Sequence, residues 1–240
     1  ISEYKFAPQK TANIILGDLF VSGRSTGMKK GELAITIPEY NRIFQVIHSV
    51  STAFDDRSGV SCLFYNTVGA FLLEKSLGVA ARAVMGAAFF RVDDATNTIL
   101  CFGDCGEDGV IKGTQDGFHC WVETENHIID FTAPMYRKYL TDLGGDIKLP
   151  RKMFQKQKEL MAQSHENLNV EGDYFVEPNP ELSLELALKG ARNPEMGDLA
   201  DACLQWFKRP PKKIRSSLPL SNHGQLIEIK LTGLSVLGAW

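Results

Sequence analysis

A cysteine, a histidine and an aspartate follow one another along the chain as Cys62, His119 and Asp130. A cysteine sulfur can attack a carbonyl carbon, a histidine can take up and return the proton, and a carboxylate can orient the imidazole ring. Taken singly, each residue has a simpler explanation, since free cysteine is commonly a small buried hydrophobic residue. Their order and local context favour acyl transfer through a cysteine thioester.

Cys62 lies where an apolar helix is expected to begin. The composition predicts a helix over residues 60–77 that Gly78 ends, with Ser58 or Ser61 as its N-cap. A thiol in the first turn of a helix lies at the positive end of the helix dipole, which favours the thiolate. The backbone N–H groups there, together with Ser61, can also stabilise an oxyanion.

Two strand-like segments, 117–124 and 127–132, are expected to form a β-hairpin whose tip is the polar pair 125–126. Thr124 then pairs with His127, which fixes the register of the whole hairpin. A slip of one residue would turn every side chain to the other face.

In this register His119 and Asp130 are diagonal neighbours on one face of the hairpin, which they share with Trp121. Diagonal neighbours in a sheet are within reach of one another, so we expect Asp130 to orient His119. Trp121 is a candidate for substrate binding or for the oxyanion site. Cys120 is expected to point to the opposite face, away from His119.

The motifs around these residues resemble the transglutaminase-like core of the papain-like cysteine protease superfamily. They are Gly59-Val-Ser-Cys62, Leu77-Gly-Val-Ala-Ala-Arg-Ala-Val-Met-Gly86, His119-Cys-Trp-Val-Glu123 and Ile129-Asp-Phe-Thr132. The resemblance covers residues 55–135 and extends to an uncharacterised bacterial family of that superfamily. It implies a papain-like cysteine proteinase fold, with the nucleophile helix packed on an antiparallel sheet.

By the same resemblance Cys62 is the nucleophile, His119 the general base and acid, and Asp130 the orienting carboxylate. The implied reactions are hydrolysis of a peptide or amide, deamidation, and transfer of the acyl group to an amine. Two alternatives stay open. One is acyl transfer like that of arylamine N-acetyltransferases, which use the same order of residues. The other is a catalytically idle papain-like domain for peptide binding or scaffolding. It is motivated by residues 55–57, which stand where papain-like enzymes carry an oxyanion glutamine.

The composition is that of an ordinary globular protein. Of 240 residues, 44% are hydrophobic and 23% charged, which excludes a disordered chain, a collagen-like repeat and a coiled coil. The net charge of −3 is too balanced to indicate a nucleic-acid partner, and no membrane-spanning segment is expected. The expected partner is a peptide, amide or acyl small-molecule substrate, and the oligomeric state stays open. The sequence begins at Ile1 rather than Met, which leaves open what precedes it.

The five cysteines are an odd number and do not indicate a disulfide framework, so reduced thiols and a cytoplasmic location are expected. Three residues separate Cys101 from Cys105, and the neighbours His119 and Cys120 point to opposite faces of a strand, so no zinc site is predicted. Neither a cofactor nor a metal is expected. Cys101 and Cys105 are interpreted as thiols of a surface turn, and Cys203 as a helix core residue.

The chain is expected to form a single α+β domain over residues 1–240. The catalytic core spans about 40–135, a helical elaboration spans 136–207, and a late strand lies within 218–240. Besides the helix over 60–77, we expect a helix that begins at Pro38 and three more at 151–168, 181–190 and 195–207. Besides the hairpin, we expect strands at 80–92, 97–103 and 225–231.

Two segments are expected to be loops. Residues 22–31 are rich in turn formers and charge, and residues 208–217 carry five basic residues in their first eight positions around a proline pair. The second segment is interpreted as a solvated loop, with a basic tether to an acidic partner as the alternative.

Overall fold

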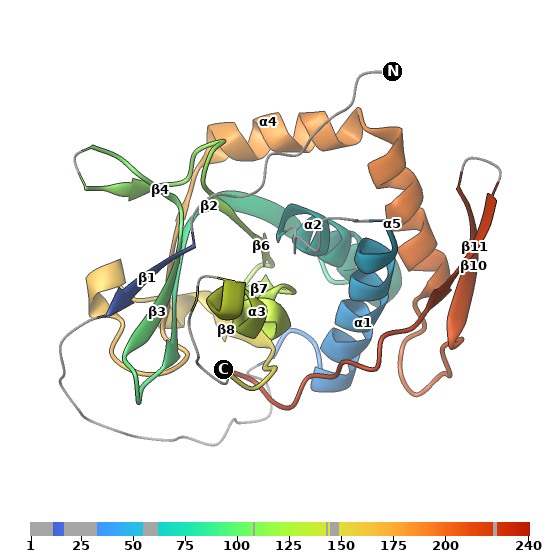
Figure 1. Ribbon diagram of the computed structural model, residues 1–240, viewed down its shortest axis with the longest axis horizontal. Helices are drawn as coiled ribbons and strands as arrows, with labels where there is room; N and C mark the ends of the chain where they lie inside the picture. The colour runs from blue at the N-terminus through green and yellow to red at the C-terminus, as the bar shows by residue number, and fades with distance from the viewer. Residues whose placement is uncertain are drawn as a thin grey trace.

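The computed structural model describes residues 33–54, 62–107, 109–142, 144, 149–222 and 225–240, and the backbone of strand β1 (Ala12–Leu16). The expected loop at 22–31 lies outside the described residues. The helices are α1 (Ile37–Phe54), α2 (Cys62–Leu72), α3 (Tyr136–Asp142), α4 (Pro180–Ala191) and α5 (Pro194–Trp206). Figure 1 shows their arrangement around the sheet.

A seven-stranded antiparallel sheet forms the centre of the fold. Its order is β1–β3–β2–β6–β7–β8, with β9 also paired to β2. After β1, its strands are β2 (Arg82–Asp93), β3 (Thr98–Phe102), β6 (His119–Glu123), β7 (His127–Asp130), β8 (Phe154–Gln157) and β9 (Tyr174–Pro178). Two short hairpins stand apart, β4 (Asp104–Cys105) with β5 (Ile111–Lys112) and β10 (Ser217–Asn222) with β11 (Gln225–Lys230).

The helix expected to begin at Pro38 is confirmed, and a capping box fixes its start. The backbone N–H of Thr36 donates to Glu39 Oε2 at 2.9 Å, and the backbone N–H of Glu39 donates back to Thr36 Oγ1 at 3.4 Å. The apolar face of α1 is fully buried, which the period of its hydrophobic residues predicts.

Both faces of the β6–β7 hairpin are covered. On one face Val122, Ile129 and Phe131 belong to a hydrophobic cluster shared with α1, α2 and α5. On the other face Trp121 and Ile128 pack in a cluster with α3 and the C-terminal Trp240. The hairpin therefore lies in the interior of the molecule (Figure 1).

The prediction of a helix over 151–168 is wrong. Residues 154–157 form β8, which pairs with β7, and only single 3-10 turns follow at Lys158–Leu160 and His165–Asn167. Met153 and Phe154 of the expected apolar stripe are buried, whereas Leu160 and Met161 are exposed. The free edge of β7 needs a hydrogen-bonding partner, and this long-range pairing overrides the local helical pattern.

The expected division into a core and a helical elaboration is also too simple. The helices expected at 181–190 and 195–207 are confirmed as α4 and α5. However, β8 and β9 also come from the 136–207 region and complete the main sheet.

The late strand is confirmed as β11, which pairs with β10 to form a hairpin that the sequence did not indicate. Leu218 and Ile229 of this hairpin belong to the same hydrophobic cluster as α1 and α2. The last residues then run along α1 to the residue before β8, where the Trp240 N–H donates to the Met153 carbonyl at 3.0 Å. Within the described residues, no helix has both the length and the apolar character needed to cross a membrane.

Candidate functional site

The expected hairpin register is confirmed. Val122 pairs with Ile129 and Glu123 with Ile128. The Thr124 N–H donates to the His127 carbonyl at 3.0 Å across the turn. The polar pair at the tip and the alternation of apolar residues thus place the two strands as the sequence predicts.

This register brings His119 and Asp130 together. The Nε2 atom of His119 lies 2.7 Å from Oδ2 of Asp130, and both side chains are completely buried. The second ring nitrogen of His119, Nδ1, is also buried. The imidazole ring is therefore held through one nitrogen, and its other nitrogen is turned away from the carboxylate.

Four further hydrogen bonds hold the Asp130 carboxylate. Its Oδ1 atom accepts from Asn66 Nδ2 at 2.9 Å, from the Thr132 N–H at 2.8 Å and from the Thr132 hydroxyl. Its Oδ2 atom, besides His119, accepts from the Tyr136 hydroxyl at 2.6 Å. These donors compensate for the loss of water around a buried charge.

The charge state of the pair follows from these contacts. Burial alone would raise the pKa of Asp130, but the positive His119 and the hydrogen bonds from Thr132 and Tyr136 hold that pKa below its usual value. Burial alone would lower the pKa of His119, but the charge and hydrogen bond of Asp130, with a smaller contribution from Cys62, raise it to about 10. At neutral pH the pair is an imidazolium and a carboxylate.

Cys62 is the first residue of α2 and is only 1% exposed. The interaction of its thiol with His119 is one of the smaller causes that raise the pKa of the imidazole. The structure thus brings the three expected residues together in one buried group.

Asn66 links Cys62 to the hairpin, although the sequence did not single it out. Its Nδ2 atom lies 3.2 Å from the Cys62 carbonyl and 2.7 Å from the Cys120 carbonyl, and its Oδ1 atom accepts from the Phe131 N–H at 2.9 Å. The sequence did contain a signal for this role, because Asn66 is a polar amide within a largely apolar helix. A buried amide must find hydrogen-bond partners, so such a residue is expected to link the helix to another element.

Aromatic rings enclose the imidazole of His119. The ring of Phe102 stacks on it with centroids 4.3 Å apart, and Phe90 meets it edge-on at 5.6 Å. From α1, the Tyr40 hydroxyl donates to the backbone carbonyl of Asp130. The site is therefore held by side chains on helices α1, α2 and α3 as well as by the sheet.

The sheet forks beside His119. On one edge of β2, Gly86 aligns with both His119 of β6 and Pro178 of β9. A Cβ atom at Gly86 would lie 2.0 Å from the Glu177 carbonyl oxygen, so a side chain cannot be accommodated there without displacing β9. The beginning of β6 thus lies at the point where β9 takes over the edge of β2.

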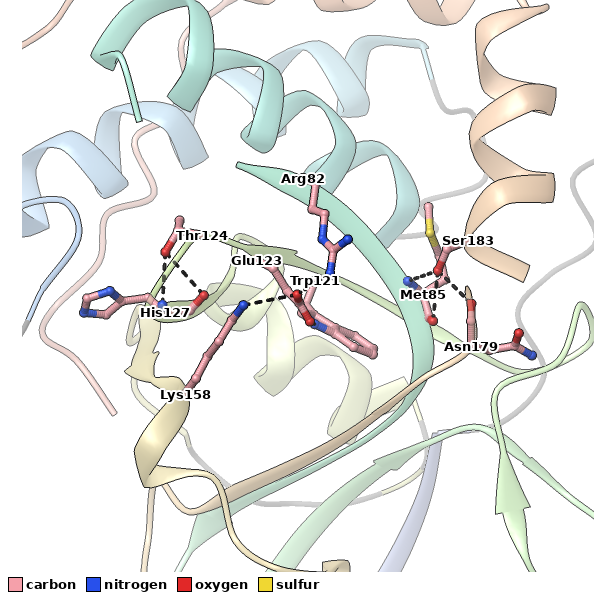
Figure 2. A network of polar contacts seen from close by, with 9 residues as sticks. All are labelled: Arg82, Met85, Trp121, Glu123, Thr124, His127, Lys158, Asn179 and Ser183. Carbon is pink, nitrogen blue, oxygen red and sulfur yellow. Dashed lines mark hydrogen bonds and ion pairs between the residues drawn. The ribbon is translucent and has the colours of Figure 1, made fainter. Parts of the chain in front are cut away.

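A different polar network lies at the turn end of the hairpin (Figure 2). Glu123 accepts from Arg82 Nη2 at 3.0 Å, from Lys158 Nζ at 3.2 Å and from Trp121 Nε1 at 3.4 Å. Burial by itself would raise the pKa of Glu123. The hydrogen bonds from Arg82 and Lys158 outweigh this effect, so the pKa is lowered. This network joins β2, β6 and the residue after β8.

The remaining residues that the sequence suggested for the site are not all placed beside His119. Ser61 and Ser58 lie outside the described residues. Trp121 is completely buried, and its indole N–H is directed to Glu123 and not to His119. Cys120, on the opposite face of β6 from His119, belongs to the same buried cluster as Cys62.

The remaining cysteines are free. The interpretation of Cys101 as a surface thiol is wrong, because it lies buried in β3, where the alternation of side chains directs it inward. Cys105 is exposed, and Cys203 is buried in α5 as expected. In the part of the chain that the structure describes, no three His, Cys, Asp or Glu side chains gather as metal ligands would.

Comparison with known proteins places the chain among its relatives. The model of a family described as "Protein of unknown function (DUF2026)" matches residues 36–240. The chain belongs to this family. The chain is also similar to a crystal structure of a genomics target, with 31% sequence identity and a TM-score of 0.77 over 89% of this chain and 100% of the other. No curated protein matches the chain.

Proposed function

We propose that this protein of the DUF2026 family is a cysteine-nucleophile enzyme that cleaves or transfers an amide or peptide acyl group through a Cys62 thioester. The observation that carries the proposal is the buried pair of His119 Nε2 and Asp130 Oδ2, with the buried Cys62 thiol close enough to the same imidazole to affect its pKa. An imidazole fixed by a carboxylate beside a thiol is the arrangement of a nucleophile and its base.

The reacting form is a Cys62 thiolate beside the His119 imidazolium. In the first half of the reaction the thiolate attacks the carbonyl carbon, and a tetrahedral oxyanion forms. His119 gives its proton to the leaving amine as the carbon–nitrogen bond breaks, which leaves a thioester on Cys62. The position of Cys62 at the start of α2 puts the positive end of the helix dipole beside the sulfur and the oxyanion.

In the second half a water molecule or an amine attacks the thioester, and His119, now neutral, takes up its proton. The tetrahedral intermediate collapses, the carbon–sulfur bond breaks, and the Cys62 sulfur leaves as the imidazolium forms again. Asp130 stays ionised throughout and stabilises that imidazolium, since five hydrogen bonds hold its carboxylate.

The α+β fold, with α2 packed against an antiparallel hairpin, supports a papain-like or transglutaminase-like assignment. The five free cysteines support a reducing compartment, and we propose the cytoplasm.

Alkylation with iodoacetamide, followed by peptide mass spectrometry, tests the proposal. Cys105 is the control thiol in the same molecule, because it is exposed and lies in a separate hairpin. The reaction is run at pH 6, where an unactivated thiol is well under about 1% thiolate and reacts slowly. We expect Cys62 to react at least tenfold faster than in the His119→Gln variant, with Cys105 unchanged. Equal rates in the two proteins would contradict the nucleophile assignment.

A second candidate function rests on the burial of Cys62. A thiol that is 1% exposed also suits a catalytically idle papain-like domain that binds peptides or serves as a scaffold. Incubation with peptide thioesters and with acetyl-CoA separates the candidates. An acyl adduct on Cys62, absent from Cys62→Ser, supports catalysis, and an adduct from acetyl-CoA alone supports chemistry like that of arylamine N-acetyltransferases. If no donor gives an adduct, the result contradicts catalysis and supports the catalytically idle domain.

A further inference from the structure

A second region of the molecule gathers unpaired positive charge. Residues 208–215, which follow α5, contain five basic residues in a chain whose net charge is −3. Of these five, Arg209 is the one that forms an ion pair within the described residues. Its Nε atom lies 2.6 Å from Glu39 Oε1. Arg42 of α1 adds another cation, because its Nη1 donates to the carbonyls of Lys208 and Lys212 at 3.3 Å each.

A cavity of about 170 Å³ opens within this basic patch, between the end of α5 and the start of β10. Three cations, an amide and two apolar side chains line it: Lys208, Lys213, Arg215, Gln205, Trp206 and Leu218. The two apolar side chains are buried. Over the residues that the structure describes, no carboxylate lines the cavity.

Hydrogen bonds fix the two sides of the cavity to one another. The Trp206 Nε1 atom donates to the Arg215 carbonyl at 3.0 Å, which ties the end of the loop to the last residue of α5. The Lys208 ammonium donates to the Gln205 carbonyl at 3.1 Å. The backbone that carries the cations is therefore held in place by the end of the helix.

Compensation of the helix dipole explains only part of this charge. A cation near a helix C-terminus is favourable, and Lys208 has this role through its bond to Gln205. Lys213 and Arg215 come later in the chain, and within the described structure their side chains form no ion pair. Their charges are therefore not compensated by a carboxylate within the described structure.

We propose that this cavity binds a small phosphate-bearing anion. Its volume is below the range of about 300 Å³ and more that sites for drug-sized ligands occupy, so it suits a phosphate or pyrophosphate group. Arginine binds phosphate oxygens through two parallel N–H bonds, and lysine supplies a point charge. This site is independent of Cys62 and of the proposed acyl transfer.

Isothermal titration calorimetry of the full chain with inorganic pyrophosphate at low ionic strength tests the site. We expect saturable binding with one site per chain, weakened at least tenfold in a Lys213→Gln/Arg215→Gln variant. The matched control is Lys189→Gln on the exposed surface of α4, which should bind as the unchanged protein does. All substitutions are at exposed positions, so thermal unfolding should stay unchanged.

Equal binding in the double variant and the control, or no saturation at all, would overturn the proposal. A parallel experiment measures co-sedimentation with phosphatidylserine vesicles and with neutral vesicles. If the chain binds anionic vesicles but not pyrophosphate, the cations recognise a lipid surface and the small-anion site is wrong.

Discussion

The two ends of the β6–β7 hairpin each hold a carboxylate with a lowered pKa, but in opposite surroundings. Asp130 at the open end is completely buried and bonded to groups that are themselves buried. Glu123 at the turn end is bonded to Arg82 and Lys158, whose side chains are 76% and 37% exposed. The first carboxylate is bonded entirely within the interior, and the second is bonded to cations that reach the solvent. A lowered pKa therefore indicates a reactive group only when it is combined with burial and a titratable partner.

The sharpest test of this difference exchanges each carboxylate for its amide. Asp130→Asn leaves the buried imidazolium without its counter-charge, so we expect a loss of about 3–5 kcal/mol in unfolding free energy. Glu123→Gln, with partly exposed partners, should cost about 1 kcal/mol or less. Urea denaturation measures both. Similar losses in the two variants would contradict the contrast between the two ends.

The pH dependence of stability should come mainly from the open end. The pKa of His119 is raised to about 10, so its contribution is complete below the unfolded value near 6.5 and is lost as pH rises through 10. Asp130, with a lowered pKa, contributes above its unfolded value and loses this contribution only in acid. Between pH 7 and 9 the unfolding free energy should fall by about 1 kcal/mol per pH unit. In His119→Gln this slope should disappear, whereas Arg82→Gln should keep it.

Replacement of Asn66 should cause the next largest loss of unfolding free energy at the open end of the hairpin. Asn66→Leu keeps the volume but leaves the Phe131 N–H and the Cys120 carbonyl without their partner, at an expected cost of about 2–3 kcal/mol. The alkylation rate of Cys62 at pH 6 should fall as well, because the start of α2 loses its link to the hairpin. Thr67→Val, at the next position of α2, is the control and should leave that rate unchanged.

Tyr136 donates one of the five hydrogen bonds to Asp130, and its removal should have a smaller effect. Tyr136→Phe is expected to cost about 1–2 kcal/mol, because a charged acceptor loses one neutral donor. The alkylation profile of Cys62 against pH should shift, since a less well compensated carboxylate changes the proton affinity of His119. An unchanged profile would mean that Tyr136 supports the fold but not the site.

Arg82 gives the smallest expected effect. Its guanidinium is largely exposed, so Arg82→Gln should change the unfolding free energy by less than about 1 kcal/mol. The effect should shrink further in 0.5 M salt, where exposed ion pairs are screened. A loss as large as that of Tyr136→Phe would place the turn end among the main supports of the hairpin.

The sequence predicts the hairpin register because two short-range signals agree, a polar pair at the tip and alternating apolar residues on either side. It does not predict β8, because this strand depends on its pairing with β7, whereas the segment 151–168 that contains it has a helical pattern. Cys62, His119 and Asp130 follow from residue type and order. Asn66 and Tyr136 are invisible at that level, since their partners lie on other elements and only the packing of helices on the hairpin brings them together.

The amide of Asn66 also has a consequence for folding. It joins α2 to residues 54, 64 and 65 positions further along the chain, at Cys120, Asp130 and Phe131. Contacts of such long range require the helix to be docked on the hairpin, and the chain closes large loops to make them. A chain in which α2 is not docked therefore lacks the arrangement that places the thiol beside the imidazole. Any reactivity of the site would be a property of the complete tertiary structure and would be lost when α2 separates from the hairpin.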